Sequence, residues 1–302
     1  MRDDKPSATA YLIARSTYLL SRDPALGYLV PEQSAELSRW FIETQCRFRK
    51  SLDAITNFQP IAHALERLTI PGIRLHYALR KRYLEEVARD SLRRGTRQIV
   101  VIGAGFDTLA LRLSLEFKET AFFEIDHPAT QREKKRVIEN HQMISDNLHF
   151  VALDIAHRNL EESLLAQTSY SPRAQTLFIA EGVLMYLSLA EVNLIFQFIR
   201  EHSGRFESRF AFTFVEMQED GRIGFRKSSP VVDAWLRLRG ESFKWGISHE
   251  QIADFLHARG FKVCEVLTAK DLRARYLAST RSRNFWSAEG ECICVVEPEL
   301  KG

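Results

Sequence analysis

Apolar residues in the middle of the chain follow two patterns, and the two alternate. Short, nearly continuous apolar runs rich in β-branched and aromatic residues predict strands, and segments with apolar residues three or four positions apart predict helices. The predicted strands are Gln98–Ile102, Thr120–Ile125, Leu148–Leu153, Gln175–Ala180 and Arg209–Val215. The predicted helices are Leu109–Leu115, Pro128–Ile144, Glu161–Gln167 and Leu189–His202. Continuous apolar strands that alternate with helices predict an α/β fold, with a parallel sheet covered on both faces.

The first ninety residues predict helices joined by turns that contain proline. Between Pro31 and Pro60 apolar residues at helical spacing predict one helix, and Ile73 to Leu92 predicts another. The apolar positions of the first are Leu37, Trp40, Phe41, Thr44 and Phe48. Basic residues lie among them, and a helix packed on the core with a solvated basic side is favoured over a helix that lies on a membrane.

The last third of the chain breaks the alternation. Residues 217–246 contain four glycines and one proline, which predicts an irregular insertion. A helix over Glu250–Arg259 ends at Gly260, a residue type that often ends helices. Phe261–Leu267 and Glu291–Glu297 predict two strands with a polar, basic link between them, and we expect them to form a hairpin at the edge of the sheet.

Composition is that of an ordinary globular protein. The 302 residues are 45% hydrophobic and 27% charged, so the chain can bury a core without disulfides or metals. The net charge of +3 is small and does not favour nucleic acid or a membrane as the main partner. Composition indicates nothing about the oligomeric state.

Cysteine usage and the start of the chain bear on location. We interpret the four cysteines, none in a CxxC pair, as buried free thiols rather than metal ligands. They are Cys46, Cys264, Cys292 and Cys294. The apolar pieces near the start are interrupted by Arg15 and Arg22, so we expect no secretory signal, and no apolar run has the length of a membrane span. These features predict a cytoplasmic protein.

The first predicted strand of the sheet ends in a glycine-rich turn, Gly103-Ala104-Gly105. Between a strand and a helix, glycines let the backbone approach a ligand and present its N–H groups. A dinucleotide fingerprint would have a third glycine at position 108, where this chain has Thr108. The turn therefore predicts a nucleotide-type site and counts against NAD or FAD.

Acidic residues stand at the ends of the next three strands. Asp126 can accept hydrogen bonds from both hydroxyls of a ribose, and Glu124, on the same face, could share that role. Asp154 can accept from an adenine amino group. Glu181 follows a buried run and needs a cation, such as the amino group of a bound amino acid; Arg80 could pair with it or with a ligand carboxylate. Each aspartate could instead only cap the following helix.

Five motifs, taken together, resemble the leucine carboxyl methyltransferase family, which includes bacterial polyketide O-methyltransferases. They match that family in type, order and spacing over roughly residues 78–200, and the stretch RGESFKWGI at 239–247 matches more loosely. The five are ALRKRYLEE at 78–86, RQIVVIGAGFDTLALRL at 97–113, FFEIDHP at 122–128, LDI at 153–155 and AEGVLMYL at 180–187.

The resemblance implies a seven-stranded class I methyltransferase sheet, mostly parallel with a C-terminal antiparallel hairpin, and S-adenosyl-L-methionine as cofactor without a metal. It implies a helical cap over 1–94 and a core over 95–302, with the insertion near 217–246, folded as one unit. Arg15 is a loosely aligned further cofactor contact. The other implied contacts are Gly103 and Gly105 under the methionine part, Arg80 on its carboxylate, Asp126 on the ribose, Asp154 and Ile155 beside adenine, and Glu181 near the methionine end.

The acceptor is less well defined. In the eukaryotic members that methylate a phosphatase, an arginine stands two residues after the adenine-side acid; here that position is Ala156, which favours a small-molecule acceptor. A carboxylate acceptor is ionised at neutral pH and needs no base, whereas a phenol or alcohol benefits from one. Tyr186 is the candidate for positioning the acceptor. His127 and His157 are candidate bases, although a cap or surface role is favoured for each.

We therefore predict methyl transfer to an oxygen of a small molecule, with three alternatives open. These are carboxyl methylation of a protein or peptide C-terminus, an NAD(P)-dependent oxidoreductase, and a silent cofactor-binding protein. The basic residues between Arg74 and Arg97 also invite a nucleic-acid interpretation. Because Glu85, Glu86 and Asp90 lie among them at helical spacing, salt-bridged helix faces are favoured.

Overall fold

The computed structural model describes residues 5–44, 59–156, 159–202, 208–277 and 285–299. The helices are α1 (Ala8–Ser21), η1 (Gly27–Leu29), α2 (Glu32–Glu43), α4 (Gln59–Thr69), α5 (Ile73–Arg93), α6 (Leu109–Glu116), α7 (Pro128–Asn140), α8 (Leu160–Leu165), η2 (Leu184–Tyr186), α9 (Leu189–His202), α10 (Pro230–Arg239), α11 (Ile252–His257) and α12 (Ala269–Tyr276). The strands are β1 (Gln98–Ile102), β2 (Ala121–Asp126), β3 (Leu148–Ala152), β4 (Thr176–Ala180), β5 (Arg209–Val215), β6 (Phe261–Leu267) and β7 (Glu291–Pro298).

The seven strands form one sheet in the order β3-β2-β1-β4-β5-β7-β6. The first five run parallel, and β7 lies antiparallel between β5 and β6. This confirms the predicted mostly parallel sheet with a C-terminal antiparallel hairpin. The strand order reverses between β1 and β4, and in open α/β sheets ligands bind outside the carboxyl ends of the strands at such a point.

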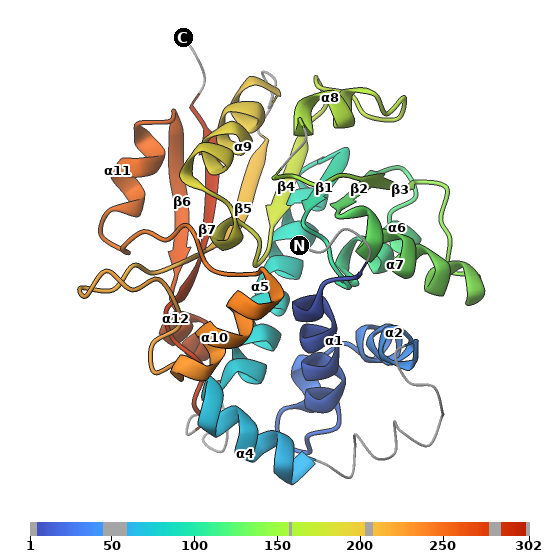
Figure 1. Cartoon of the computed structure of the whole chain (residues 1–302). Coiled ribbons are helices and arrows are strands. Elements are labelled where there is room, and N and C mark those ends of the chain that lie inside the picture. The colour runs from blue at the N-terminus through green and yellow to red at the C-terminus, as the bar shows by residue number, and fades with distance from the viewer. Residues whose placement is uncertain (1–4, 45–58, 157–158, 203–207, 278–284, 300–302) are drawn as a thin grey trace.

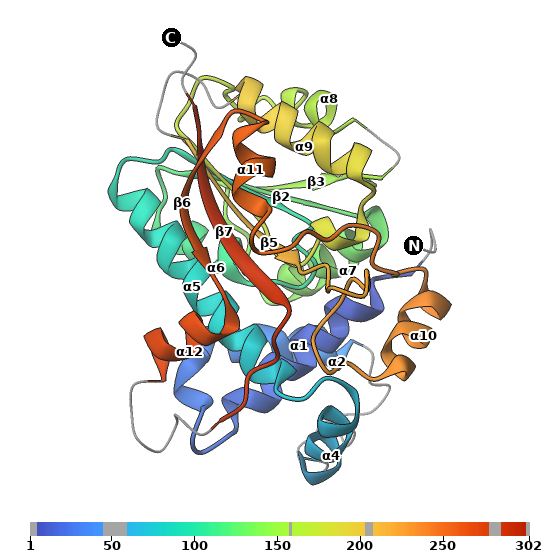
Figure 2. The ribbon, with the colours of Figure 1, turned by 90° about the vertical axis from the view of Figure 1, so that its left-hand side faces the viewer.

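Helices cover both faces of the sheet, as the unbroken apolar strands predict (Figure 1). On one face, buried residues of α1, α2, α5, α6 and α7 pack against alternate residues of β1 and β2 such as Val101 and Phe122. On the other face, α8, α9 and α11 pack against the residues between them, such as Val100 and Phe123. Figure 2 shows α9 and α11 on the side of the sheet opposite α5 and α6. The sheet is thus the middle layer of three.

The N-terminal helices pack beside α5, and α1 contacts both α2 and α5. Of the helix predicted between Pro31 and Pro60, the structure describes α2; Phe48 and the other positions in 45–58 lie outside the described residues. In α2, Leu37, Phe41 and Ile42 are buried, so this helix packs on the core as expected. The domain boundary near residue 94 falls directly after α5 and stays a prediction.

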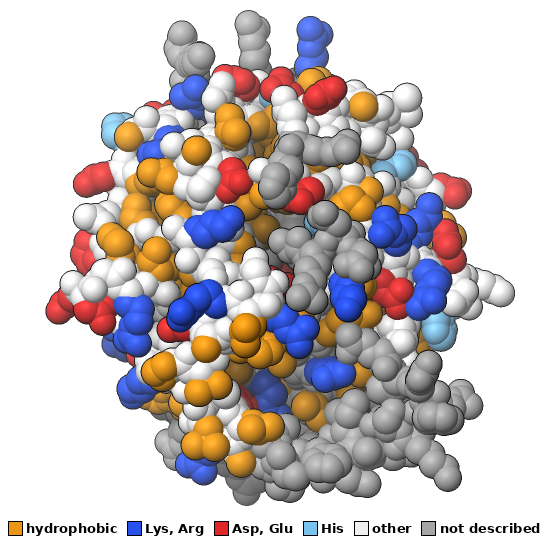
Figure 3. All heavy atoms as spheres, viewed as in Figure 1, with side chains coloured by type: hydrophobic (Ala, Val, Ile, Leu, Met, Phe, Trp, Pro, Cys, Tyr) orange, Lys and Arg blue, Asp and Glu red, His pale blue; other side chains and the backbone are white. Residues whose placement is uncertain are grey.

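Two helices were missed by the sequence prediction. The segment predicted to be an irregular insertion contains α10, which Ser229 caps and Gly240 ends in the left-handed conformation. The polar link before β7 contains α12, which begins with a capping box formed by Thr268 and Asp271. Both helices bury few residues, so they lack the wide apolar stripe on which the prediction depends. Hydrophobic side chains gather on the surface over α4 and α10 in Figure 3. The exposed apolar residues of these two helices include Leu65, Leu68, Val231 and Leu238.

The cysteine interpretation is partly wrong. Cys292 and Cys294 are buried free thiols on β7, as expected, but Cys264 on the edge strand β6 is exposed. Cys46 lies outside the described residues. Among the residues that the structure describes, no helix combines the length and apolarity that a membrane crossing requires.

Candidate active site

One cavity opens at the carboxyl ends of β1, β2, β3 and β4, where the strand order reverses. Apart from Arg15, it brings together the residues predicted to bind the cofactor or position the acceptor. These are Arg80, Gly103, Gly105, Asp126, Asp154, Ile155, Glu181 and Tyr186. Three segments far apart in the chain complete its walls: the start of α1, the end of β4 with η2, and the residues after α10. Arg15 is not among the lining residues.

The glycine turn after β1 needs glycine for two reasons. Gly103 and Gly105 have positive φ angles of 71° and 50°, which L side chains rarely adopt. A Cβ atom on Gly103 would also meet Val183 at 2.7 Å. The side chain at Thr108, where a dinucleotide site would have glycine, instead bonds Ser34 of α2 at 2.9 Å. Thr108, at the start of α6, therefore contacts the N-terminal helix α2.

Asp126 closes the turn from the neighbouring strand. Its carboxylate accepts hydrogen bonds from the backbone N–H groups of Gly105 at 2.6 Å and His127 at 2.7 Å. Burial raises the pKa of Asp126, and these two bonds oppose that rise. The carboxylate thus lies at the cavity wall, braced by backbone donors, where a ribose hydroxyl could reach it.

Glu124, the proposed substitute for Asp126, does not line the cavity. It is 2% exposed and pairs with Lys134 of α7 at 2.6 Å. Burial raises the pKa of Glu124 to about 7, against the opposite effect of Lys134. Lys134 also donates to the carbonyl of Asp107 at 2.5 Å, so this pair supports the glycine turn from below. The alternative that Glu124 shares the ribose contact is wrong.

Arg80 lies between two carboxylates. Its guanidinium contacts Glu181 at 2.8 Å and Glu291 of β7 at 2.8 Å, and all three side chains are nearly inaccessible to solvent. His76 contacts the same Glu291 at 2.7 Å. Burial alone would lower the pKa of Arg80, but the charges of Glu291 and Glu181 outweigh it and raise that pKa. Burial would likewise raise the pKa of Glu291, yet Arg80 and His76 hold it at about 2.

Lys81, next to Arg80, was missed by the sequence analysis. It contacts Asp107 at 2.6 Å and Glu181 at 3.1 Å, and it lines the cavity beside both. Burial would raise the pKa of Asp107, but Lys81 and Lys134 lower it. A lysine in a helix rich in arginine gave no signal of its own. The methionine end of the predicted site therefore contains paired anions and cations that could exchange partners with a zwitterion.

The predicted adenine side consists of Asp154 and Ile155, with Ala156 beside them at the cavity wall. The backbone N–H of Ala156 donates to Asp154 at 3.2 Å. His127 accepts from the backbone N–H of Ala129 through Nδ1 at 3.3 Å and so caps α7. The favoured cap interpretation of His127 matches this geometry. His157 lies outside the described residues.

The far end of the cavity is built by Tyr186 and by segments that carry no family motif or match one loosely. Burial raises the pKa of the Tyr186 phenol, and its ring packs against Phe243 with centroids 5.5 Å apart. Glu241 accepts hydrogen bonds from Ser7 at 3.1 Å and from Thr9 of α1. The segment after α10 is fixed to η2 by the backbone N–H of Lys244, which donates to Met185 at 2.7 Å.

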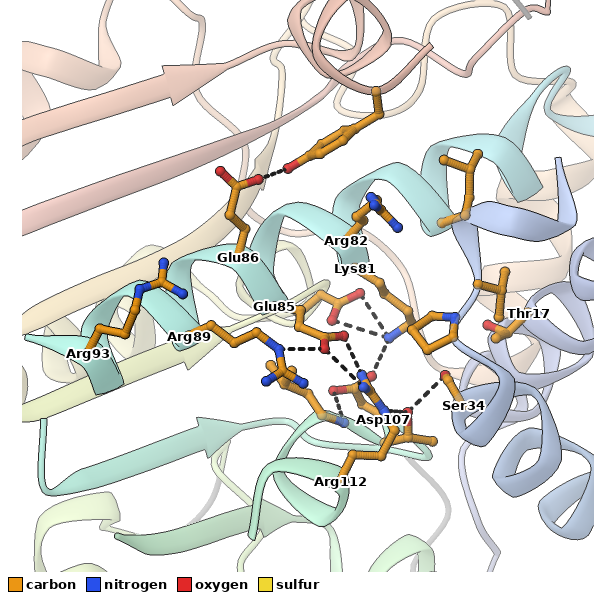
Figure 4. Close-up of a pocket in the computed structure, with 18 residues that line it drawn as sticks. Thr17, Ser34, Lys81, Arg82, Glu85, Glu86, Arg89, Arg93, Asp107 and Arg112 are labelled. Carbon is orange, nitrogen blue, oxygen red and sulfur yellow. Dashed lines mark hydrogen bonds and ion pairs between the residues drawn. The ribbon is translucent and has the colours of Figure 1, made fainter. Parts of the chain in front are cut away.

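An adjoining cavity between α5, α6 and α2 meets the first one at Lys81, Asp107 and Glu181 (Figure 4). Three of its arginines, Arg82, Arg89 and Arg93, belong to the basic cluster that invited a nucleic-acid interpretation, and Arg112 of α6 joins them. Figure 4 shows Arg89 and Arg112 directed at Glu85, with distances of 3.0 and 2.6 Å. On the same helix, Arg94 pairs with Asp90 at 2.9 Å. The expected salt-bridged helix faces are present.

The strand order, the antiparallel β7 and a ligand-sized cavity above a glycine turn define the class I methyltransferase fold. Among the described residues, no group of His, Cys, Asp and Glu has a geometry suited to a metal ion.

The chain belongs to the leucine carboxyl methyltransferase family, whose model matches residues 7–200. A relative from Mycobacterium marinum is 29% identical over 67% of this chain and 65% of its own length. YktD from Bacillus subtilis is 25% identical over 67% of this chain and 66% of its own length. Rv3399 from Mycobacterium tuberculosis is 30% identical over 65% of this chain and 57% of its own length. All three carry a provisional name, S-adenosyl-L-methionine-dependent methyltransferase.

The matches thus span less than two thirds of the length of these relatives. Among solved structures, magnesium protoporphyrin IX methyltransferase from Synechocystis PCC 6803 aligns with 74% of this chain and 85% of its own, at 13% identity and a TM-score of 0.45.

Proposed function

We propose that this protein transfers a methyl group from S-adenosyl-L-methionine to an oxygen of a small-molecule acceptor. The observation that carries the proposal is the buried Arg80–Glu181 ion pair beside the glycine turn. Two opposite charges at a cavity wall match the carboxylate and ammonium of a methionine moiety. Family membership supports the same cofactor.

The roles we propose follow the resemblance residue by residue. Arg80 binds the cofactor carboxylate, and Glu181 accepts a hydrogen bond from the cofactor amino group. These two contacts with the cofactor would replace the Arg80–Glu181 ion pair. Gly103 and Gly105 let the backbone pass under the methionine part, Asp126 accepts from the ribose hydroxyls, and Asp154 and Ile155 flank adenine. All of these residues line one cavity, which is the geometry that the roles require.

Methyl transfer from a sulfonium requires in-line approach of the acceptor oxygen and exclusion of water, and the protein supplies mainly position. The cofactor, when bound, supplies the electrophilic methyl group. Tyr186, at the wall beyond Glu181, is the side chain that we propose orients the acceptor. The cavity is covered by α1 and by the segment after α10, and both would limit access of water.

Two of the alternatives lose support. Family membership does not support an NAD(P)-dependent oxidoreductase, and the place of the third glycine is taken by Thr108 in contact with Ser34. Methylation of a protein C-terminus remains an alternative proposal. It is weakened because Ala156, where the phosphatase-methylating members have arginine, offers no cation to a substrate carboxylate.

Calorimetric titration of the purified protein with S-adenosylhomocysteine, NAD and NADP tests the proposal. We expect a saturable heat with S-adenosylhomocysteine and none with either nicotinamide cofactor. Transfer of a labelled methyl group from S-adenosylmethionine to a panel of phenols, alcohols and carboxylates then tests turnover. Binding of NAD without binding of S-adenosylhomocysteine would contradict the proposal, and binding without turnover across the panel would favour a silent cofactor-binding protein.

A further inference from the structure

The cavity continues past Tyr186 into a region formed by neither the glycine turn nor the strand ends. Its walls are Ser7 and Thr9 at the start of α1, and Glu241 and Lys244 after α10. Glu241 is 8% exposed, and Lys244 is exposed at the rim. This region lies where an acceptor would approach. Among its described residues, the Glu241 carboxylate is the one buried charge.

Glu241 differs from four of the carboxylates described above. Glu181, Asp107, Glu291 and Glu124 each have a lysine or arginine nitrogen within 2.6 to 3.1 Å. Glu241 has two hydroxyl donors, Ser7 and Thr9, and in the described part of the chain no Lys, Arg or His nitrogen lies within 4.0 Å of it. A buried carboxylate without a cation is costly, and a ligand that donates a hydrogen bond or a proton reduces that cost.

The unpaired carboxylate discriminates between the two acceptor classes that remain open. A hydroxyl acceptor can donate its hydrogen to Glu241, which strengthens binding and prepares the oxygen for attack. A carboxylate acceptor would bring a second anion into a region of low dielectric, where like charges repel strongly. Lys244 offers little compensation because its solvent-exposed side chain is well screened.

We propose that Glu241 selects an acceptor whose reacting group is a hydroxyl, such as a phenol or an alcohol, and acts as its general base. The inference rests on the proposed function. The acceptor oxygen forms a bond to the methyl carbon while the carbon–sulfur bond breaks, and the bonding pair stays on sulfur, giving neutral S-adenosylhomocysteine. The hydroxyl proton passes to the Glu241 carboxylate, directly or through the Thr9 hydroxyl, and is then released to solvent.

The probes that test this are 1-naphthol and 1-naphthoate, which share one ring system and differ in the reacting group. Their affinities are measured by naphthyl fluorescence at neutral pH, with the full chain saturated with S-adenosylhomocysteine. Three proteins are compared: wild type, Glu241→Gln, and Glu219→Gln as a matched control on an exposed acid of the same insertion. Glutamine at 241 can still hydrogen-bond Ser7 and Thr9, so equal melting temperatures would show that the fold is kept.

We expect the wild type to bind naphthol about tenfold more tightly than naphthoate, the scale of a charge-assisted hydrogen bond. Glu241→Gln should abolish this preference and strongly slow methyl transfer to naphthol, Glu241→Asp should restore part of both, and Glu219→Gln should change neither. Equal or tighter binding of naphthoate by the wild type, absence of naphthol binding, or an unchanged ratio in Glu241→Gln would overturn the inference while leaving cofactor binding intact. Failure of S-adenosylhomocysteine itself to bind would instead overturn the proposed function.

Discussion

The two ends of the cavity differ in how their charges are paired. At the methionine end, Arg80 and Lys81 pair with carboxylates from three other segments of the chain. At the acceptor end, the Glu241 carboxylate is held by two hydroxyls, and Tyr186 also lines the cavity. At the methionine end, the charges are paired with one another and could bind a zwitterion. At the acceptor end, the Glu241 carboxylate has no cationic partner among the described residues and could bind a hydrogen-bond donor. The cofactor should therefore depend on the network, and acceptor choice on Glu241 and its neighbours.

The largest effect is expected from Arg80→Met. Removing the guanidinium leaves Glu181 and Glu291 without their shared buried cation, so the free energy of unfolding should fall by about 3–5 kcal/mol and binding of S-adenosylhomocysteine should be lost. Urea unfolding and calorimetry measure the two effects. The control is Arg82→Met on the exposed side of the same helix, which should change stability by less than about 1 kcal/mol. Equal effects of the two variants would show that the network is not special.

Glu291→Gln tests the same network through pH. The pKa of Glu291 is lowered to about 2 in the folded protein from an ordinary 4.5, so its ionised form stabilises the fold above pH 4.5. That stabilisation, about 3 kcal/mol for such a shift, is lost as pH falls from 4.5 toward 2. Urea unfolding at a series of pH values should show wild type and variant far apart at pH 7 and converging in acid. A gap that stays constant with pH would refute the assignment.

Asp126→Ala is expected to weaken S-adenosylhomocysteine binding by about 1–3 kcal/mol, because a charge-assisted bond to the ribose is lost. Since Glu124 is held by Lys134, it cannot replace the lost carboxylate. Calorimetry measures the affinity. Asp126→Asn can still accept a hydrogen bond from the Gly105 N–H, so this variant separates the role of Asp126 in holding the glycine turn from its role in binding the ligand. Unchanged affinity in a folded alanine variant would remove Asp126 from the site.

The smallest effect is expected from Tyr186→Phe at the acceptor end. Loss of one neutral hydrogen bond should weaken naphthol binding about threefold to tenfold and leave the affinity for S-adenosylhomocysteine unchanged. Fluorescence titration and calorimetry measure the two affinities on the same sample. A loss of cofactor affinity in place of naphthol affinity would assign Tyr186 to the methionine end, and the two ends would then be less separate than their charges indicate.

The sheet and the cofactor end could be predicted because their signals are local. Unbroken apolar runs marked β1 to β5 within about a residue, and Gly103, Asp126 and Glu181 each directly follow or end a strand. Glu291 and Lys81 could not be found, because their partners are set by tertiary packing over as many as 215 residues of separation. Glu241 was missed for a further reason: it follows α10, a helix that buries only Leu236 and therefore lacks an apolar stripe.

A crystal structure of the protein with S-adenosylhomocysteine would show whether the cofactor takes the place of the Arg80–Glu181 contact. We expect the ligand carboxylate on Arg80, its amino group on Glu181 with the Arg80–Glu181 contact broken, and the ribose hydroxyls on Asp126. We also expect Glu291 to keep its contact with Arg80. S-adenosylhomocysteine bound elsewhere, or bound in this cavity with the Arg80–Glu181 pair intact and Asp126 contacting only the glycine turn, would contradict this expectation.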